Sequence, residues 1–523
     1  MKLNNSYIGI VIPILISSAA SYAQTIDWNV PIGGNVSRNG ISQYYGPLVA
    51  TGGQPELYWS GGEYAKYAGH PVIEGDKLLV YRRWSSASQT ESWIVCYNVY
   101  TGTELWKVTL PVDPQSDHYG KVSGVNNGQV YATRAGGHTS PSSLYALDIE
   151  TGTVLWQSEG DVTEYRSETV TFAENGNIIA GNVDEILCIN KDDGTTAWSL
   201  DRHCWDDAGA SVSAYGDRGY YWDRAAGTLD LVISVCDLET GNYLYSTDAI
   251  TTGGIQAQQA PITIGPDGTV YSTRSNSIPD FDYITSFTDT GTGFIWNWEY
   301  PTAWVTFGNH GAAPDGTVYT YSRTNEIVRL DPTDGTVLNT SIPISTGYSV
   351  SPAIAFGADG YVYFTSEDYP TFQLYFFTPE LELLWTEVIN GIRGVAVGDS
   401  VVAVCGKGTE IRAYRGRSGT GIAETNIGSI PSCISLTASP SPSSDQTILT
   451  FELAEATDVK LDIFDVAGRL VRRFDLGQMQ PQEHSVIWNG QDQSGLPVAD
   501  GIYMVRLTGG GITFANTRVV CIR

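Results

Sequence analysis

The chain has 523 residues, of which 57 are acidic and 29 basic, giving a net charge of −28 at pH 7. This charge excludes nucleic acid and anionic membrane surfaces as partners, because their phosphates would be repelled. The chain also has 57 Gly, 31 Tyr and 14 Trp but only 3 Met. Aromatic residues suit pleated sheets and glycine suits tight turns, so the composition predicts an all-β fold.

Residues 1–23 are predicted to be a secretory signal peptide. A lysine at position 2 is followed by an apolar stretch from Tyr7 to Ile16 and by small residues up to Ala23, the pattern of a cleaved signal. The apolar stretch is too short to span a bilayer, and no later segment approaches a transmembrane span. No cysteine precedes Cys96, so an N-terminal lipid anchor is not expected. We therefore expect export and a secreted or cell-surface location.

One unit recurs along residues 24–428. It consists of an apolar strand, a turn rich in Asp, Thr and Gly, and a strand that closes on an aromatic residue, as in Cys96–Trp106, Tyr145–Trp156 and Ser286–Trp296. The turn glycines return at intervals of about 47 residues, which is the length of one four-stranded propeller blade.

A second signature precedes several copies of this unit. It contains Asp-Gly and reads Gly265–Tyr271, Ala313–Tyr319 and Gly357–Tyr363. Asp-Gly between apolar strands is typical of a hairpin with a type I′ turn, so each unit predicts two hairpins and four antiparallel strands. We predict an eight-bladed β-propeller. Seven blades is the alternative if the N-terminal stretch closes the last blade, with Trp59, one repeat length before Trp106, in the closing strand.

The order strand, Asp-Gly-x-Val-Tyr, strand, Asp-x-x-Thr-Gly-x-x-x-Trp resembles the pyrroloquinoline-quinone-like (PQQ-like) propeller repeat. The resemblance implies a propeller over residues 24–428 in which each Trp docks its blade against the next. For the enzymes of that family it also implies a quinone in the propeller mouth, a calcium ion and a catalytic Asp. We expect neither PQQ nor calcium here, because the chain has no adjacent cysteine pair and no recognisable set of calcium ligands. No catalytic residue is predicted.

Residues 429–445 are predicted to be a linker, because Ser and Pro alternate in Ser439–Ser444, and residues 446–523 to be a small separate domain. In that domain Ile463–Arg469, Trp488–Gly490 and Asp500–Tyr503 resemble the FlgD-like Ig domain and the sorting domain of type IX secretion cargo. The resemblance implies recognition by an export apparatus, with cleavage or anchoring left open.

Local roles within this C-terminal domain follow from residue type. Gly468 and Gly490 should serve turns, while Trp488 and Tyr503 should fill a sandwich core. Among the seven cysteines, Cys433 and Cys521 lie near the two ends of the domain, so a disulfide between them is one hypothesis. No spacing of Cys and His predicts a zinc site.

The inner strand of each blade should line a central channel, and the loop before it should open onto one face, the mouth. Residues in these loops are polar or aromatic and differ between blades, which is typical of a binding surface on a repeating scaffold. Ordinary loop composition is the alternative interpretation. The candidate ligand-binding residues are His70, Tyr119, Arg166, Trp205, Asp206, Gln259, Trp304, His310, Tyr348 and Arg393.

The preferred function is a secreted or cell-surface, non-enzymatic propeller that binds a protein or glycan at its mouth and the export machinery through its C-terminal domain. A quinoprotein-like oxidoreductase or a polysaccharide-active propeller is the first alternative, and an envelope assembly scaffold the second. No metal site is predicted. The neighbours in His203–Asp207 rarely converge on one ion, and Asp267, Asp315 and Asp359 fit turns better than calcium loops.

Overall fold

The structure is a computed structural model of the chain. It describes residues 28–47, 55–61, 67–68, 70–83, 92–110, 121–133, 142–162, 169–182, 184–203, 211–250, 261–275, 282–303, 310–344, 353–366, 372–389, 394–405, 411–416, 433–440, 443, 446–453, 456–464, 470–493, 495–499, 501–509 and 512–521. Over these ranges the chain forms strands and turns, which confirms the all-β prediction, and no helix there could cross a membrane. The chain divides into two compact units, Met1–Gly419 and Thr420–Arg523.

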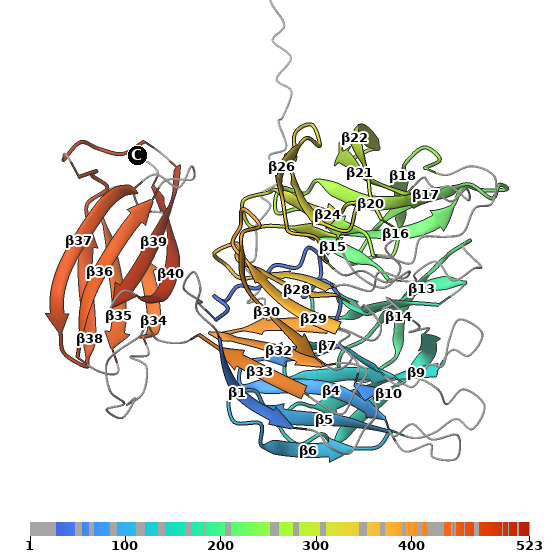
Figure 1. Ribbon diagram of the computed structural model, residues 1–523, viewed down its shortest axis with the longest axis horizontal. Coiled ribbons are helices and arrows are strands. Elements are labelled where there is room, and N and C mark those ends of the chain that lie inside the picture. Colours follow the sequence, from blue (N-terminus) through green and yellow to red (C-terminus); the bar gives the residue numbers. More distant parts are fainter. Residues whose placement is uncertain are drawn as a thin grey trace, which may run out of the picture. The chain divides into compact units, whose positions relative to one another are not determined.

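Antiparallel sheets of four or five strands succeed one another along the first unit (Figure 1), and the described residues contain eight of them. The first four sheets are β2 (Tyr67–Ala68) and β3 (Val72–Glu74) with β4 (Lys77–Arg83), β5 (Ser92–Asn98) and β6 (Glu104–Val108); β7 (Lys121–Asn126), β8 (Gln129–Thr133), β9 (Ser142–Asp148) and β10 (Val154–Val162); β11 (Thr171–Phe172), β12 (Ile178–Gly181), β13 (Glu185–Ile189) and β14 (Thr196–Asp201); and β15 (Ser213–Tyr215), β16 (Arg218–Arg224), β17 (Leu231–Asp237) and β18 (Tyr243–Ser246).

The remaining four sheets continue in chain order, and the eighth takes its outer strand from the N-terminal end of the chain. They are β19 (Thr263–Ile264), β20 (Val270–Ser275), β21 (Asp282–Asp289) and β22 (Phe294–Pro301); β23 (Gly311–Ala312), β24 (Val318–Tyr321), β25 (Ile327–Leu330) and β26 (Val337–Thr340); β27 (Ala353–Phe356), β28 (Val362–Ser366), β29 (Phe372–Phe377) and β30 (Leu383–Ile389); and β31 (Gly394–Gly398), β32 (Val401–Cys405) and β33 (Ile411–Arg415) with β1 (Glu56–Gly61).

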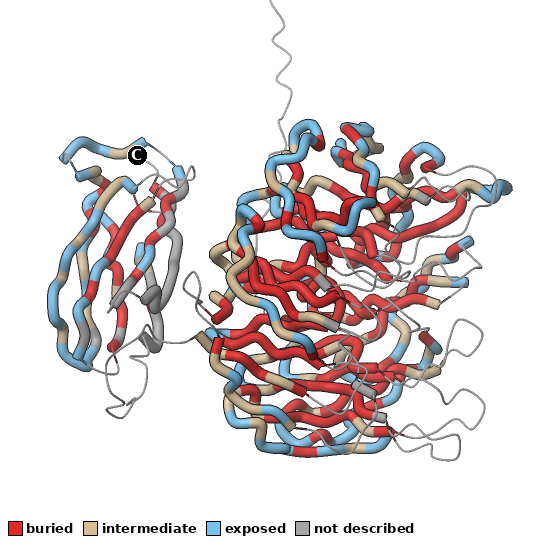
Figure 2. Tube along the Cα trace, viewed as in Figure 1, coloured by how far each residue is buried: buried red, intermediate tan, exposed pale blue. Residues whose placement is uncertain are grey.

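Each sheet runs from a buried inner strand to a half-exposed outer strand. In the third sheet β11 and β12 are buried throughout, whereas β14 alternates between partly buried and exposed positions. A strand packed on both faces needs apolar residues at every position, while a strand with one solvent face alternates. Figure 2 shows the buried strands in red and the exposed turns in pale blue. The apolar runs of the repeat are therefore the inner and middle strands.

The N-terminal strand closes the ring of sheets. β1 pairs antiparallel with β33, with Glu56 opposite Arg415 and Gly61 opposite Ile411, so β1 completes the eighth sheet and adds no sheet of its own. This confirms that Trp59 lies in a closing strand. The inner strand β3 contacts both β7 and β31, and Figure 1 shows β1 in blue beside β33 in orange. The first unit is a β-propeller.

The Asp-Gly turns between inner and second strands differ in type from the prediction. In Gly265–Gly268 the amide of Gly268 donates to the carbonyl of Gly265 at 3.0 Å, and Gly268 has a φ of +86°. Asp267 has no positive φ, so this is a type I turn followed by a left-handed glycine, and the expected type I′ turn needs two residues with positive φ. Asn127 and Gly128, with φ values of 52° and 73°, do form the two-residue turn.

The second turn of each sheet explains the Asp-x-x-Thr-Gly motif. The carboxylate oxygen Oδ1 of Asp148 accepts hydrogen bonds from the amides of Glu150 and Thr151 and from the Thr151 hydroxyl, at 3.1, 2.8 and 2.8 Å. Gly152 follows with a φ of +70°, where a side chain would be strained. The aspartate therefore caps its own turn.

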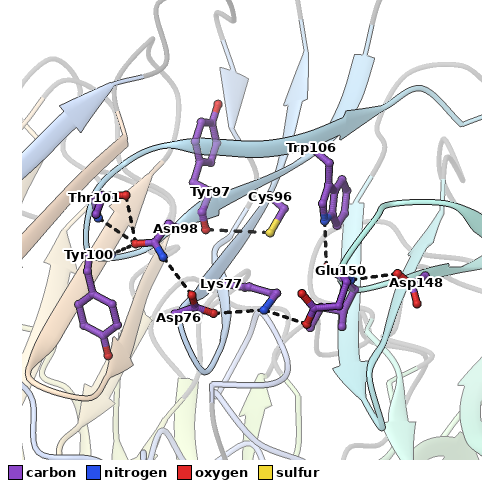
Figure 3. Close-up of polar contacts among 11 residues, drawn as sticks. Asp76, Lys77, Cys96, Tyr97, Asn98, Tyr100, Thr101, Trp106, Asp148 and Glu150 are labelled. Carbon is purple, nitrogen blue, oxygen red and sulfur yellow. Dashed lines mark hydrogen bonds and ion pairs between the residues drawn. The ribbon is translucent and has the colours of Figure 1, made fainter.

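Tryptophans on the outer strands join neighbouring sheets. Trp106 Nε1 donates to the carbonyl of Ile149 at 2.9 Å, and a Cβ on Gly152 would lie 2.5 Å from the Trp106 ring. Figure 3 shows this joint, which Lys77 strengthens by pairing with Asp76 at 3.2 Å and Glu150 at 2.9 Å. The predicted docking role of Trp is confirmed. The same ring-on-glycine contact joins other sheets through Trp59 and Gly102, Trp156 and Gly194, Trp198 and Gly241, and Trp298 and Gly335.

One docking residue differs from the predicted repeat. Trp296, at which the unit Ser286–Trp296 was expected to close, is 43% exposed, whereas Trp298 is 8% exposed. Ser286 lies opposite Trp298 in the ladder, as Cys96 lies opposite Trp106. Ser286 and Trp298 are 12 residues apart, whereas Cys96 and Trp106 are 10 residues apart, so a longer hairpin shifts the docking position along the sequence.

The second unit is a β-sandwich. One sheet has the order β34 (Cys433–Ser439), β35 (Thr447–Leu453) and β38 (Glu483–Trp488), and the other β37 (Leu470–Met479), β36 (Thr457–Phe464), β39 (Gly501–Gly509) and β40 (Ile512–Cys521). Trp488 and Tyr503 belong to its core, with ring centroids 5.2 Å apart. Trp488 Nε1 donates to Gln491 and the Tyr503 hydroxyl to Ala499, so both rings fill the core as predicted. Gly490 has the positive φ of a turn glycine; Gly468 lies outside the described residues.

Two expectations for this unit are corrected. β34 lies inside the range predicted as a linker, 429–445, and pairs with β35. Cys433 pairs with Leu453 at one end of β34, whereas Cys521 bridges Ser443 beyond the other end. The length of β34 alone separates these ends by about 20 Å, while disulfide-bonded residues have Cα atoms about 6 Å apart. The arrangement therefore excludes a Cys433–Cys521 disulfide.

Candidate binding face

Most of the predicted mouth residues lie outside the part of the chain that the structure describes. These are Tyr119, Arg166, Trp205, Asp206, Gln259, Trp304, Tyr348 and Arg393. Each of these residues lies in a segment that joins the outer strand of one sheet to the inner strand of the next. The described strand ends that flank these segments therefore all lie on one side of the ring. We call this side the mouth face and the side of the Asp-Gly turns the turn face.

His310 does not point into the mouth as predicted. It precedes β23 and is fully buried, with Nε2 at 2.5 Å from the Thr273 hydroxyl on β20 and Nδ1 at 2.9 Å from the Thr320 hydroxyl on β24. Burial lowers the pKa of His310 to about 3. The ring is therefore neutral at physiological pH and joins the fifth and sixth sheets.

His70 keeps its predicted place at the start of an inner strand. It precedes β3 and is partly buried, and a Cβ on Gly394 would lie 2.6 Å from its Nδ1. Gly394 begins β31, so the imidazole packs where the eighth sheet meets the first. Ligand binding by His70 stays a prediction.

Residues 28–45 occupy the turn face and contact every sheet. Their main-chain carbonyls accept hydrogen bonds of 2.7 to 3.0 Å from amides at the far ends of the inner strands, beside the Asp-Gly turns. The donors and acceptors are Ile73 to Trp28, Val125 to Asn29, Ala214 to Val36, Ile264 to Ser37, Ala312 to Asn39 and Phe356 to Gly40. Side chains bond the remaining two sheets. Arg38 donates to the carbonyl of Val170 in the third sheet, and the Ser42 hydroxyl donates to the carbonyl of Val397 in the eighth. This segment closes the turn-face end of the ring.

Arg38 anchors this axial segment. Its side chain is fully buried, and Nη2 donates to the carbonyls of Thr169 at 3.2 Å and Val170 at 2.5 Å. The chain folds tightly around it, because a Cβ on Gly33 would lie 2.5 Å from the Arg38 backbone and Gly33 has a φ of +75°. A buried guanidinium is tolerated only when carbonyls or carboxylates satisfy its donors. No sequence pattern predicted this arrangement, because the segment lacks the repeat.

A cluster of two arginines and a tyrosine lies at the mouth face between the fifth and sixth sheets. Arg274 on β20 pairs in register with Tyr283 on β21, and its guanidinium carbon lies 4.8 Å from the Tyr283 ring centroid. Arg323, from the turn after β24, lies 5.2 Å from the same centroid. Hairpin register could have predicted the first contact, but the second joins two sheets and has no local sequence signal.

Several aspartates of the turn face cap their own turns. Asp148, Asp193 and Asp334 accept hydrogen bonds from threonine amides and hydroxyls, which hold the pKa of each carboxyl below its usual value. Asp267 and Asp315 bond Thr269 and Thr317 in the same way. Over the described residues no group of three or more His, Cys, Asp or Glu could hold a metal ion. These aspartates supply negative charge and turn caps.

Comparison with known proteins agrees with both units. Two overlapping segments, residues 33–201 and 90–242, match the family model of the outer membrane protein assembly factor BamB, and residues 438–511 match that of the FlgD Ig-like domain. No curated protein matches the sequence.

Similar solved structures share little sequence. BamB from Moraxella catarrhalis is 13% identical over 69% of this chain and 100% of that chain, with a TM-score of 0.47. PorZ, described as an essential bacterial surface component of the type-IX secretion system of Porphyromonas gingivalis, is 12% identical over 91% of this chain and 71% of that chain, with a TM-score of 0.40. The chain carries a BamB-like, PQQ-like repeat region within residues 33–242 and a FlgD Ig-like domain at residues 438–511.

Proposed function

We propose that this protein is a non-enzymatic binding propeller that acts outside the cell or on its surface and takes a protein or glycan at its mouth face. One observation carries this proposal: residues 28–45 occupy the ends of the inner strands at the turn face. The opposite ends, where eight non-repeating segments join the sheets, are left for a ligand. Binding sites on repeating scaffolds commonly lie on such variable connections.

We also propose that the protein functions without PQQ or calcium. The aspartates of the Asp-Gly turns use their carboxylate oxygens to cap those turns, as Asp267 does for Thr269 and Asp315 for Thr317. A surface location agrees with the predicted signal peptide, residues 1–23, and with the FlgD Ig-like domain at residues 438–511. We propose that this domain contacts the export machinery.

The binding role is tested with the mature chain, residues 24–523, on glycan and surface-protein arrays. Trp205→Ala with Trp304→Ala should weaken binding roughly 30-fold or more, because buried aromatic anchors dominate interfaces. Trp296→Ala is the matched control, since Trp296 is 43% exposed on the outer strand β22. All variants should keep the wild-type melting temperature. Full binding by the double variant, or equal loss in the control, would overturn the proposal.

The enzymatic alternative is separated by native mass spectrometry after adding calcium and PQQ. The binding proposal expects the mass of the bare protein. A stoichiometric adduct would contradict the non-enzymatic assignment and direct attention to alcohol and sugar oxidation.

A further inference from the structure

The axial segment, residues 28–45, begins with a buried side chain. Trp28 is 1% exposed, and its ring packs so closely on Gly34 that a Cβ there would lie 2.6 Å from it. The carbonyl of Trp28 accepts a hydrogen bond from the amide of Ile73 at 2.9 Å, and the amide of Asn29 donates to the carbonyl of Gly34 at 3.0 Å. The segment is therefore seated in the ring from its first described residue onward.

The seat of Trp28 is built by sheets that are far apart in the sequence. Trp28 belongs to one hydrophobic cluster with residues of the first, seventh and eighth sheets, such as Leu78, Tyr363 and Val397. The eighth sheet is complete only when β1 pairs with β33, which ends at Arg415. Docking of the axial segment therefore needs both ends of the propeller chain in place.

A short tether separates Trp28 from the predicted signal peptide, residues 1–23. Trp28 is five residues beyond Ala23, and five residues span at most about 17 Å when fully extended. Until it is removed, a signal peptide holds the start of the mature chain at the membrane through its apolar stretch. Trp28 of the precursor can then reach its seat only if the turn face lies within that distance of the membrane.

The charge of the turn face opposes such an approach. Its exposed acids outweigh the basic residues that pair with them, since each acid is more than half exposed and each base less than one third exposed. The acids are Asp76, Glu150, Asp192, Asp217 and Asp315, and the bases are Lys77, Lys191, Arg218 and Arg329. An anionic membrane surface repels a face of this kind. The tether and the charge together keep the axial segment of a membrane-held precursor out of its seat.

We infer that removal of the predicted signal peptide permits the axial segment to dock, so that the propeller of the precursor stays unclamped until it is processed. The occupant of the seat is residues 28–45 of the same chain. The inference rests on the predicted export and not on the ligand of the mouth face. Cleavage near the N-terminus thereby times the completion of the propeller, because the undocked segment leaves amides at the ends of several inner strands without their carbonyl partners.

The test uses the full-length precursor with Ala23→Leu, because a large residue blocks cleavage at a small-residue site. It is anchored in vesicles of phosphatidylethanolamine and phosphatidylglycerol and compared with the mature chain, residues 24–523, added to the same vesicles. A protease should digest the anchored propeller roughly 10-fold or more faster, because digestion follows the population of the open form.

A matched control separates the tether from the anchor itself. It carries the same Ala23→Leu substitution and twenty Gly and Ser residues inserted after position 23, which have a root-mean-square reach of about 25 Å. The longer tether lets Trp28 enter its seat while the signal stays in the membrane, so this variant should resist the protease as the mature chain does.

Equal digestion of the anchored precursor and the mature chain would overturn the inference, and so would fast digestion that persists with the longer tether. Both changes lie outside the mature chain, so neither alters a residue of the folded propeller. The arrays that test the mouth face use the mature chain alone. Their failure would overturn the proposed binding function and leave the timing of docking standing.

Discussion

The tryptophan joints and the axial segment, residues 28–45, hold the same ring of sheets in different ways. Each joint is one ring on one glycine, as for Trp156 and Gly194, and connects two neighbouring sheets. The axial segment is a single stretch of chain that hydrogen-bonds every sheet in turn. The joints recur with the sequence repeat, whereas the segment has no internal repeat.

This difference separates local from global stability. Loss of one joint leaves the other contacts between sheets in place, because in repeat architectures each unit contacts its neighbours alone. Loss of the axial segment leaves amides unpaired at the ends of several inner strands simultaneously, and unpaired buried amides are costly. The segment should therefore matter more to the whole propeller than any single joint.

The largest effect is expected from Arg38→Ala. The substitution leaves a cavity and removes the donors bonded to the carbonyls of Thr169 and Val170, so the free energy of unfolding should fall by about 4 kcal/mol. The measurement is urea denaturation of the mature chain. Arg415→Ala is the control. The partly exposed pair of Arg415 with Glu56 should contribute about 1 kcal/mol or less.

A second experiment tests the segment as a whole. A chain that begins at residue 48 should lose its cooperative transition and regain it when a peptide of residues 24–47 is added. Equal losses for Arg38→Ala and Arg415→Ala, or cooperative unfolding of the shortened chain alone, would show that the sheets need no axial segment.

The next largest effect is expected from Trp156→Ala. Trp156 is 8% exposed and its Nε1 donates to the carbonyl of Lys191 at 2.9 Å, so truncation should lower the free energy of unfolding by about 3 kcal/mol. Trp296→Ala removes an equally large ring from an exposed position and should cost about 1 kcal/mol or less. Equal losses from the two substitutions would contradict the docking role of the repeat tryptophan.

The same division between repeating joints and the non-repeating axial segment separates what the sequence predicted from what it did not. Features that repeat, or that depend on neighbours in the chain, were predictable: the Asp-x-x-Thr-Gly turns, docking by Trp106, and the core role of Trp488 and Tyr503. The type I′ assignment failed because Asp267 keeps a negative φ and the following glycine alone is left-handed. Asp-Gly dipeptides serve both turn types, so sequence cannot separate them.

What the sequence could not predict depends on contacts between distant segments. Arg38 bonds the carbonyls of Thr169 and Val170, which lie more than 130 positions away in the sequence. Arg323 reaches carbonyls of another sheet, and nothing in its own turn indicates these contacts. His310 was placed at the mouth from its position before an inner strand, and its burial depends on Thr273 and Thr320 from two different sheets.

The smallest predicted effect concerns the joint between the fifth and sixth sheets. This joint contains a repeating tryptophan contact and a hydrogen-bonded histidine that does not repeat. Trp298 docks on Gly335 there, and His310 bonds the hydroxyls of Thr273 and Thr320. Burial lowers the pKa of His310 from 6.5 to about 3. Above pH 6.5 the ring is neutral in both the folded and the unfolded chain, and His310 adds no pH dependence.

Below pH 6.5 the unfolded chain takes up a proton that the folded chain refuses until about pH 3. The contribution of His310 to stability is therefore complete above pH 6.5 and falls with decreasing pH, by about 1.4 kcal/mol per pH unit. Between pH 6.5 and pH 5 the wild type should lose about 2 kcal/mol more than His310→Gln, in urea denaturation at each pH. If His310→Gln followed the wild-type curve, the imidazole would have to titrate freely in the folded chain, which contradicts its burial between two sheets and would return it to the mouth face.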